Sequence, residues 1–94
     1  MQVRWVRRAL LDLDEEVTYI AAEDPSAARL VVERVLQAVA MLSEQTALGR
    51  PGRVPGTREL VVSRTRYLVP YRVRGDIVEV LRVFHTSRRP PNKW

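Results

Sequence analysis

The 94-residue sequence contains no cysteine and a single histidine, His85. Without cysteine there is no disulfide bond, thiolate nucleophile or cysteine-based zinc site, and one histidine argues against a histidine-rich metal site. We therefore expect no metal ion and no other cofactor. No apolar run approaches the ~20 residues that cross a bilayer, and residues 1–8 lack the apolar core of a signal peptide. These absences predict a cytoplasmic protein without membrane contacts.

The length and composition predict one globular domain spanning residues 1–94. Hydrophobic residues make up 46% of the sequence and charged residues 29%, a balance typical of globular proteins. A chain of this length has room for one modest core, because small domains bury only roughly 60% of the surface that their unfolded chains expose.

The net charge of +5 hides a difference between the two halves of the chain. Residues 1–48 carry five cationic and eight acidic residues, whereas residues 49–94 carry eleven cationic and three acidic residues. Ten of those eleven cations are arginines, whose planar donors suit phosphate and carboxylate groups. This charge predicts an acidic partner: nucleic acid, a ribosomal site or an acidic protein segment. A solvated basic face is the alternative.

The first half of the sequence predicts a strand and two helices. Residues 1–6 alternate apolar and polar side chains, as a strand does. From about Arg8 to Glu23 the apolar positions recur at three- and four-residue steps, which predicts an amphipathic helix. Asp24 and Pro25 then predict the N-cap and the first position of a second helix, which we expect to end near residues 48–49.

The second half predicts a loop and three strands. Residues 49–56 hold three of the four glycines and predict a basic surface loop. Segments 57–63, 67–73 and 77–84 favour strands joined by hairpin turns, and a basic extended tail follows them. Pro70 lacks a ladder donor, which argues for an edge position, a bulge, or an N–H direction that the neighbouring strand does not need.

The predicted order of elements is therefore β-α-α-β-β-β. Because neighbouring elements with short connections usually pack together, we expect an α+β fold in which two helices cover one face of an antiparallel sheet.

Several segments along the chain carry a family resemblance in their order and spacing. They are Trp5, Ala9-x-x-Asp12-Leu13, Tyr19-Ile20-Ala21, Asp24-Pro25-x-Ala27-Ala28, Leu42, Gly49-Arg50, Thr57-Arg58-Glu59-Leu60-Val61, Tyr67-Leu68-Val69-Pro70-Tyr71-Arg72-Val73 and Val80-Leu81-Arg82-Val83-Phe84-His85. Together they resemble the RelE/ParE superfamily of type II toxins, and more its ParE-like branch. The resemblance implies a growth-inhibiting toxin of the plasmid-stabilisation kind. It also implies a cognate antitoxin that wraps the toxin and through which alone operator DNA is contacted.

The superfamily offers two kinds of target. The resemblance implies that RelE-type members cleave mRNA on the ribosome with strand-borne charged groups, whereas ParE-type members are associated with inhibition of DNA gyrase. It assigns basic positions of the RelE-type nuclease to Glu59, Val61 and Leu68, which are acidic or apolar here. We therefore expect a ParE-like toxin that inhibits gyrase. The alternatives are a ribosome-dependent mRNA endoribonuclease and a toxin-like binding module without independent activity.

One candidate catalytic residue and five candidate target-binding residues follow. His85 exchanges a proton near neutral pH, and the nuclease alternative would use it with Arg66 or Arg82; a structural histidine at a strand end is the other interpretation. The candidate target-binding residues are Arg58, Arg66, Arg82, Arg88 and Arg89. Ion pairing within the protein, for Arg82 with Glu79 or helix acids, is the alternative for some of them.

Two further groups of residues have structural interpretations. Tyr67 and Tyr71 share a strand face and fit sheet packing better than a platform for stacking bases. Asp12, Glu15 and Glu16 resemble a carboxylate cluster, but a solvated face near a helix N-terminus explains them without catalysis.

Overall fold

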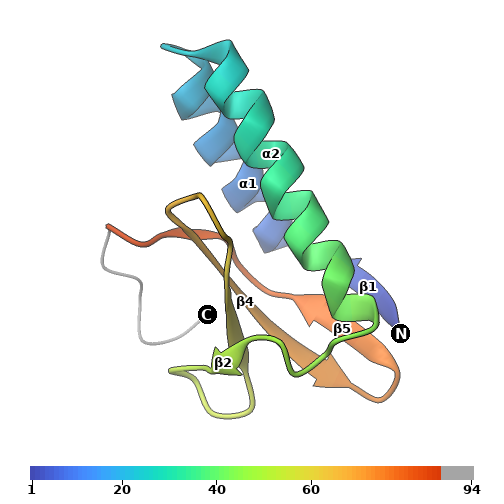
Figure 1. Ribbon diagram of the computed structural model, residues 1–94. Coiled ribbons are helices and arrows are strands. Elements are labelled where there is room, and N and C mark those ends of the chain that lie inside the picture. Colours follow the sequence, from blue (N-terminus) through green and yellow to red (C-terminus); the bar gives the residue numbers. More distant parts are fainter. Residues whose placement is uncertain (88–94) are drawn as a thin grey trace.

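The computed structural model describes residues 1–87 of the chain (Figure 1). Its elements are β1 (Gln2–Trp5), α1 (Arg7–Ala21), α2 (Pro25–Ala40), the 3₁₀ turn η1 (Met41–Ser43), β2 (Arg50–Pro51), β3 (Arg58–Val61), β4 (Tyr67–Arg74), β5 (Ile77–Val80) and β6 (Phe84–His85). This order confirms the predicted α+β fold and adds the short strands β2 and β6. Figure 1 shows α1 and α2 as a hairpin that packs on one face of the sheet and extends beyond it.

The strands pair in the order β1-β5-β4-β3-β2. The expected antiparallel pairing holds for β3, β4 and β5, with Val61 opposite Leu68 and Tyr71 opposite Val80. The N-terminal strand β1 joins the far side of β5 in parallel, so the sheet as a whole is mixed. The helical hairpin between β1 and the later strands is the crossover that parallel pairing requires.

The junction between the helices follows the predicted capping chemistry. The Asp24 carboxylate accepts a hydrogen bond from the Ala27 N–H at 3.0 Å, and Pro25 occupies the first turn of α2. The far end of α2 was predicted wrongly, because the α-helix ends at Ala40 instead of near residue 48. The Tyr71 hydroxyl donates to the Thr46 carbonyl at 2.7 Å and accepts from the Gly49 N–H at 2.8 Å, which fixes this segment in a non-helical path.

The core lies between the helices and the sheet. Tyr67 and Tyr71 are at most 5% exposed and belong to this core, as their strand face predicted. The other members of the cluster are Ala9, Val35, Val39, Leu42, Leu60, Val62, Val69, Val78, Val80 and Val83.

The last predicted strand, 77–84, is divided by a one-residue bulge. Tyr71 pairs with Val80 and Leu68 with Phe84, so two residues of β4 face three residues of the neighbouring segment. An extra residue opposite a continuous strand defines a β-bulge. It lies opposite Pro70, whose carbonyl accepts the Leu81 N–H at 2.9 Å. Of the three interpretations of Pro70, the bulge agrees with the structure, and the edge position is wrong because β4 lies between β3 and β5.

Candidate functional site

His85 lies beside groups from two other elements. It pairs with Tyr67 across β6 and β4, with the rings edge to face and their centroids 5.3 Å apart. The Tyr67 hydroxyl donates to the Glu16 carboxylate of α1 at 3.1 Å. The Ser87 N–H donates to Nδ1 of His85 at 3.1 Å, so the neutral imidazole carries its proton on Nε2. The half-buried His85 thus has a defined tautomer and orientation.

Arg66 lies next to this group. Its carbonyl accepts the Thr86 N–H at 2.7 Å, and its guanidinium lies 3.5 Å from the Ser87 hydroxyl. The exposed Arg66 side chain and His85 therefore share one end of the sheet.

Arg82 is held inside the protein. Its Nε donates to Asp12 Oδ2 at 2.7 Å and its terminal nitrogen to Oδ1 at 3.3 Å, and its side chain is 18% exposed. Its guanidinium carbon also lies 4.6 Å from the centroid of the Phe84 ring. This arrangement fits the helix-acid pairing considered for Arg82, and it leaves little of the guanidinium accessible to a target.

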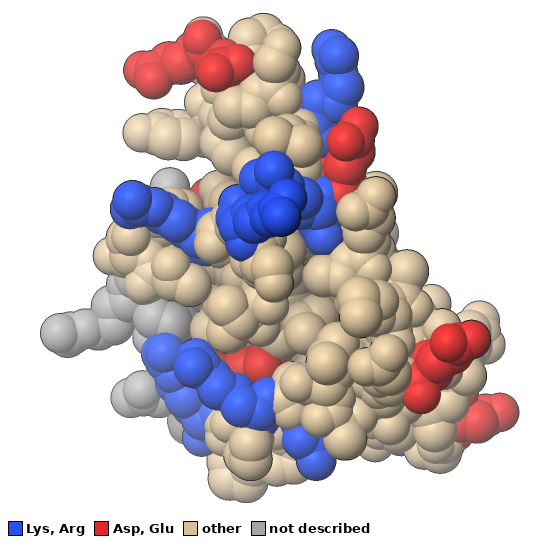
Figure 2. Space-filling view, viewed as in Figure 1, with Lys and Arg blue, Asp and Glu red and all other residues tan. Residues whose placement is uncertain are grey.

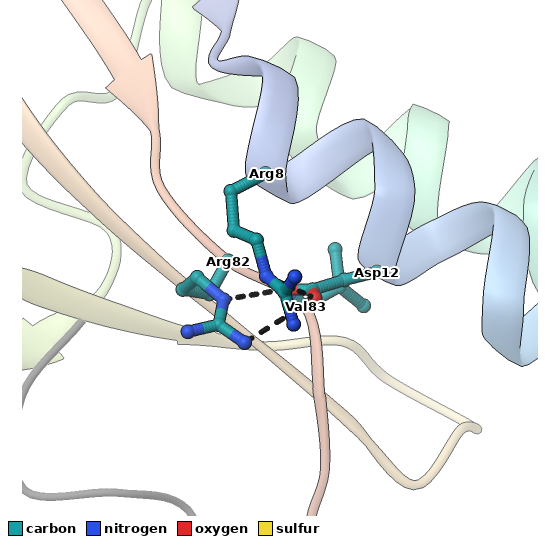
Figure 3. A network of polar contacts seen from close by, with 4 residues as sticks. All are labelled: Arg8, Asp12, Arg82 and Val83. Atoms are coloured by element: carbon teal, nitrogen blue, oxygen red, sulfur yellow. Dashed lines mark hydrogen bonds and ion pairs between the residues drawn. The ribbon is translucent and has the colours of Figure 1, made fainter.

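The solvated-face interpretation of Asp12 is wrong. Asp12 is 5% exposed and accepts the Val83 N–H at 3.0 Å, while Arg8 lies 3.3 Å from its other oxygen (Figure 3). Because α1 begins at Arg7, Asp12 lies beyond the first turn and points toward the sheet. Glu15 is exposed, as expected, whereas Glu16 is half-buried at Tyr67.

Arg58 lies at the opposite end of the β3–β4 hairpin from Arg66. It faces Tyr71 across the sheet and donates to the Gly49 carbonyl at 2.7 Å. Its sequence neighbour Glu59 is 2% exposed; its carboxylate lies 3.3 Å from Arg50 and accepts the Arg53 N–H at 2.8 Å. Glu59 therefore organises the basic loop 49–56. The three described candidates, Arg58, Arg66 and Arg82, do not share one surface, and Arg88 and Arg89 lie outside the described residues.

A groove between α2 and the edge strand β3 was not found from the sequence. Its volume is ≈ 570 Å³. Its lining comprises Arg34, Gln37, Ala38, Met41, Leu48, Arg50, Glu59, Leu60, Val61, Val62, Ser63 and Arg64. Three apolar lining residues, Met41, Leu48 and Val61, are 43–52% exposed. Figure 2 shows two groups of cationic side chains on this face, separated by mostly uncharged surface with one small acidic patch beside the lower group.

The β3 edge of this groove is open. β2 pairs only with Arg58 and Glu59, so no described strand covers β3 from Leu60 onward. Such an edge presents backbone N–H and C=O groups to an incoming chain. In the sequence, this groove is signalled only by Leu48 and Val61, two apolar residues at positions where the pattern does not predict burial. The open edge itself could not be predicted, because it depends on the order of the strands in the sheet.

Residues 1–87 contain no group of three or more His, Asp or Glu side chains that could hold a metal ion. None of the helices in this part of the chain has the length and apolar character needed to cross a membrane.

Comparison with known proteins identifies relatives over nearly the whole chain. The sequence profile of the family described as "ParE toxin of type II toxin-antitoxin system, parDE" matches residues 3–90. Y4kP of Sinorhizobium fredii, a protein with a toxin designation, is 48% identical over 96% of this chain and 93% of its own length. Toxin RelE2 of Caulobacter vibrioides is 36% identical over 93% of this chain and 97% of its own length.

Solved structures share the fold. The "Chromosomal ParDE TA system from P. aeruginosa" contains a chain with a TM-score of 0.84 and 31% identity, covering 90% of this chain and 95% of that one. The RelBE2 toxin-antitoxin complex from Mycobacterium tuberculosis contains one with a TM-score of 0.58 and 30% identity, covering 89% and 88%. With the fold and the family match in agreement, this chain belongs to the RelE/ParE superfamily of type II toxin–antitoxin toxins.

Proposed function

We propose that this toxin inhibits growth by acting on DNA gyrase and not by cleaving mRNA. The observation that supports the proposal is the chemistry at the positions assigned to basic residues of RelE-type nucleases. Glu59 is a buried acid paired with arginines, Leu68 is 2% exposed and Val61 is apolar. The apolar Val61 and Leu68 can neither donate a proton to a leaving group nor stabilise the added charge of a phosphorane. The Glu59 carboxylate is held by Arg50 and Arg53 of the loop 49–56.

A supercoiling assay tests this proposal directly. Purified toxin is added to gyrase, ATP and relaxed plasmid, with and without the cognate antitoxin. We expect supercoiling to fall with toxin concentration and to recover when antitoxin is added. Unchanged supercoiling at a large toxin excess would refute the gyrase target.

The ribosome-dependent nuclease is the second candidate, because the contacts of His85 with Tyr67 and its nearness to Arg66 give one titratable group a fixed orientation. This candidate requires codon-specific breaks in mRNA from cells that express the toxin, and loss of those breaks in a folded His85→Ala variant. A toxin-like module without activity would instead produce no growth defect when it is induced.

We also infer that the groove between α2 and β3 receives a segment of the cognate antitoxin. The apolar floor suits an amphipathic segment, and the open β3 edge suits an extended one that pairs with it. Three cations, Arg34, Arg50 and Arg64, and one acid, Glu59, line the groove, so an acidic segment has the complementary charge.

Substitutions in and outside the groove test this assignment. Val61 is 52% exposed, so Val61→Asp should leave the fold intact while placing a negative charge against an acidic segment. We expect antitoxin affinity to fall by about tenfold or more, equivalent to ~1.4 kcal/mol. Arg29→Gln, on α2 outside the groove lining, changes the net charge by the same single unit and is the matched control. Equal affinities of the Val61→Asp variant and the control would exclude this groove.

A further inference from the structure

The bulge between β5 and β6 depends on a missing donor. The Leu81 N–H donates to the Pro70 carbonyl at 2.9 Å, and a residue other than proline at position 70 could return a hydrogen bond to Leu81. Proline has no N–H, so the ladder is weakened where the extra residue enters. Beyond the bulge, pairing with β4 resumes at Phe84.

Asp12 supplies the hydrogen-bond acceptors for Arg82 and Val83 of the bulged segment, which do not pair with β4. Its Oδ2 accepts the Val83 N–H at 3.0 Å and the Arg82 Nε at 2.7 Å. Its Oδ1 lies 3.3 Å from both Arg8 Nε and the terminal nitrogen of Arg82. Figure 3 shows the two guanidinium groups converging on Asp12 beside Val83. One carboxylate of α1 therefore holds both the backbone and the side chain of the bulge.

The bulge decides which face of the sheet His85 occupies. Val78 and Val80 point into the core, so uninterrupted alternation would send residues 82 and 84 to the core face and residue 85 to the outer face. The extra residue reverses this pattern: Val83 is buried in the core, and His85 lies opposite Tyr67. Without the bulge, Phe84 would take the place of His85 beside Tyr67.

We propose that Asp12 is a positioning residue that acts through Val83 and Arg82. It holds the bulge, and the bulge presents His85 with its proton on Nε2 at the end of the sheet that carries Arg66. This end of the molecule then contributes to contact with the toxin's target. The positioning of His85 by Asp12 does not depend on the proposed toxin function. The effect of this arrangement on growth inhibition rests on that function.

The single histidine makes the arrangement measurable, because the imidazole ¹⁵N signals of the untagged protein come from His85 alone. In the wild-type protein we expect an acceptor-type Nδ1 and a protonated Nε2, because the Ser87 N–H donates to Nδ1. In Asp12→Ala we expect both signals to move toward averaged tautomers. Asp12→Asn keeps one oxygen that can accept the Val83 N–H, so its imidazole signals should lie between those of the wild type and of Asp12→Ala. Glu15→Gln, an exposed acid on the same helix, should match the wild type.

Growth inhibition is measured on the same variants at equal protein levels. We expect Asp12→Ala to reduce inhibition by on the order of tenfold to a hundredfold, with partial rescue in Asp12→Asn. Circular dichroism and antitoxin binding serve as checks on folding. If Asp12→Ala does not fold, Asp12→Asn and Arg82→Gln carry the same comparison.

Wild-type imidazole signals in a folded Asp12→Ala variant would overturn the proposal even if toxicity is lost. Altered signals with undiminished toxicity would overturn it as well. The proposed gyrase target fails separately, in the supercoiling assay with wild-type toxin, and that failure would leave the imidazole result unchanged.

Discussion

At the residue scale, the close approach of Gly49 to Tyr71 connects the loop 49–56 to the core. A Cβ atom at position 49 would lie 2.6 Å from Tyr71 Cε1 and 2.9 Å from the Glu59 carbonyl oxygen. These distances are too short for any residue with a side chain unless the backbone moves. The same glycine donates its N–H to the Tyr71 hydroxyl, so a shift would also weaken that buried hydrogen bond.

We predict that Gly49→Ala lowers the free energy of unfolding by about 2 kcal/mol, the usual effect of overpacking a filled site. Urea denaturation of the variant and wild type measures this difference. Gly56→Ala is the control for backbone strain. Position 56 has a φ of +82°, which a residue with a side chain rarely adopts, but a Cβ there would have no neighbouring atom within 4 Å. We expect that variant to lose only about 1 kcal/mol. A smaller loss for Gly49→Ala than for Gly56→Ala would contradict the packing argument.

Glu79 gives the protein a pH-dependent stability. A hydrogen bond from Arg72, together with the charges of Arg72, Arg74 and Arg4, holds the Glu79 pKa below its ordinary value of 4.5. Because the folded-state pKa is the lower one, the ionised carboxylate stabilises the fold above the unfolded-state pKa. That contribution is lost as the pH falls through the folded-state value.

We therefore predict that Glu79→Gln has a lower melting temperature than the wild type at pH 7 and that the difference shrinks below pH ~4. Thermal unfolding monitored by circular dichroism at both pH values measures it. Asp76→Asn, an exposed acid in the preceding turn, controls for the change in net charge. A difference that persists at low pH would show that the substitution acts through packing.

At the scale of elements, local signals were sufficient to place the helical hairpin and the strands β3, β4 and β5, although not all of their ends. Asp24 and Pro25 act within one turn, so the sequence alone locates the start of α2. The end of α2 depends on Tyr71, which lies about thirty residues further along the chain than Ala40. The bulge depends on Asp12, Pro70 and Val83 together, and no periodicity in a single segment reveals it.

We predict that Asp24→Ala destabilises the protein by about 1 kcal/mol, because the Ala27 N–H loses its acceptor and α2 loses its N-cap. Urea denaturation gives the value. Glu23→Ala removes a neighbouring exposed acid that caps nothing in the described structure and should change stability by less than about 0.5 kcal/mol. Equal effects of the two substitutions would point to charge, not capping, as the cause.

At the scale of the whole molecule, the charge difference between the halves of the chain predicted an acidic partner. It did not predict which arginines form ion pairs within the protein. Arg82 pairs with Asp12, Arg50 with Glu59 and Arg72 with Glu79. Each partner comes from a different element or strand, so the pairing follows from the topology. The arginines that line the groove come from different segments, so they can be identified only when the relative positions of α2 and β3 are known.

We predict that antitoxin association slows as salt rises from ~0.05 M to ~0.5 M, which shortens the screening length from roughly 14 Å to roughly 4 Å. The dissociation rate should change much less, because apolar contacts in the groove are insensitive to screening. Stopped-flow or surface-based kinetics separate the two rates. Arg64→Gln should give a shallower salt dependence than the wild type. An association rate independent of salt would contradict electrostatic steering by this face.

The open edge of β3 also affects how the toxin behaves in the absence of a partner. Exposed main-chain groups beside Met41, Leu48 and Val61 form a template for pairing with another copy of the same chain. We proposed above that a segment of the antitoxin binds here; such a segment would block this self-pairing as well as neutralise the toxin. A toxin variant that no longer binds an antitoxin segment at this edge would leave it open to other copies, so we expect such a variant to aggregate more readily.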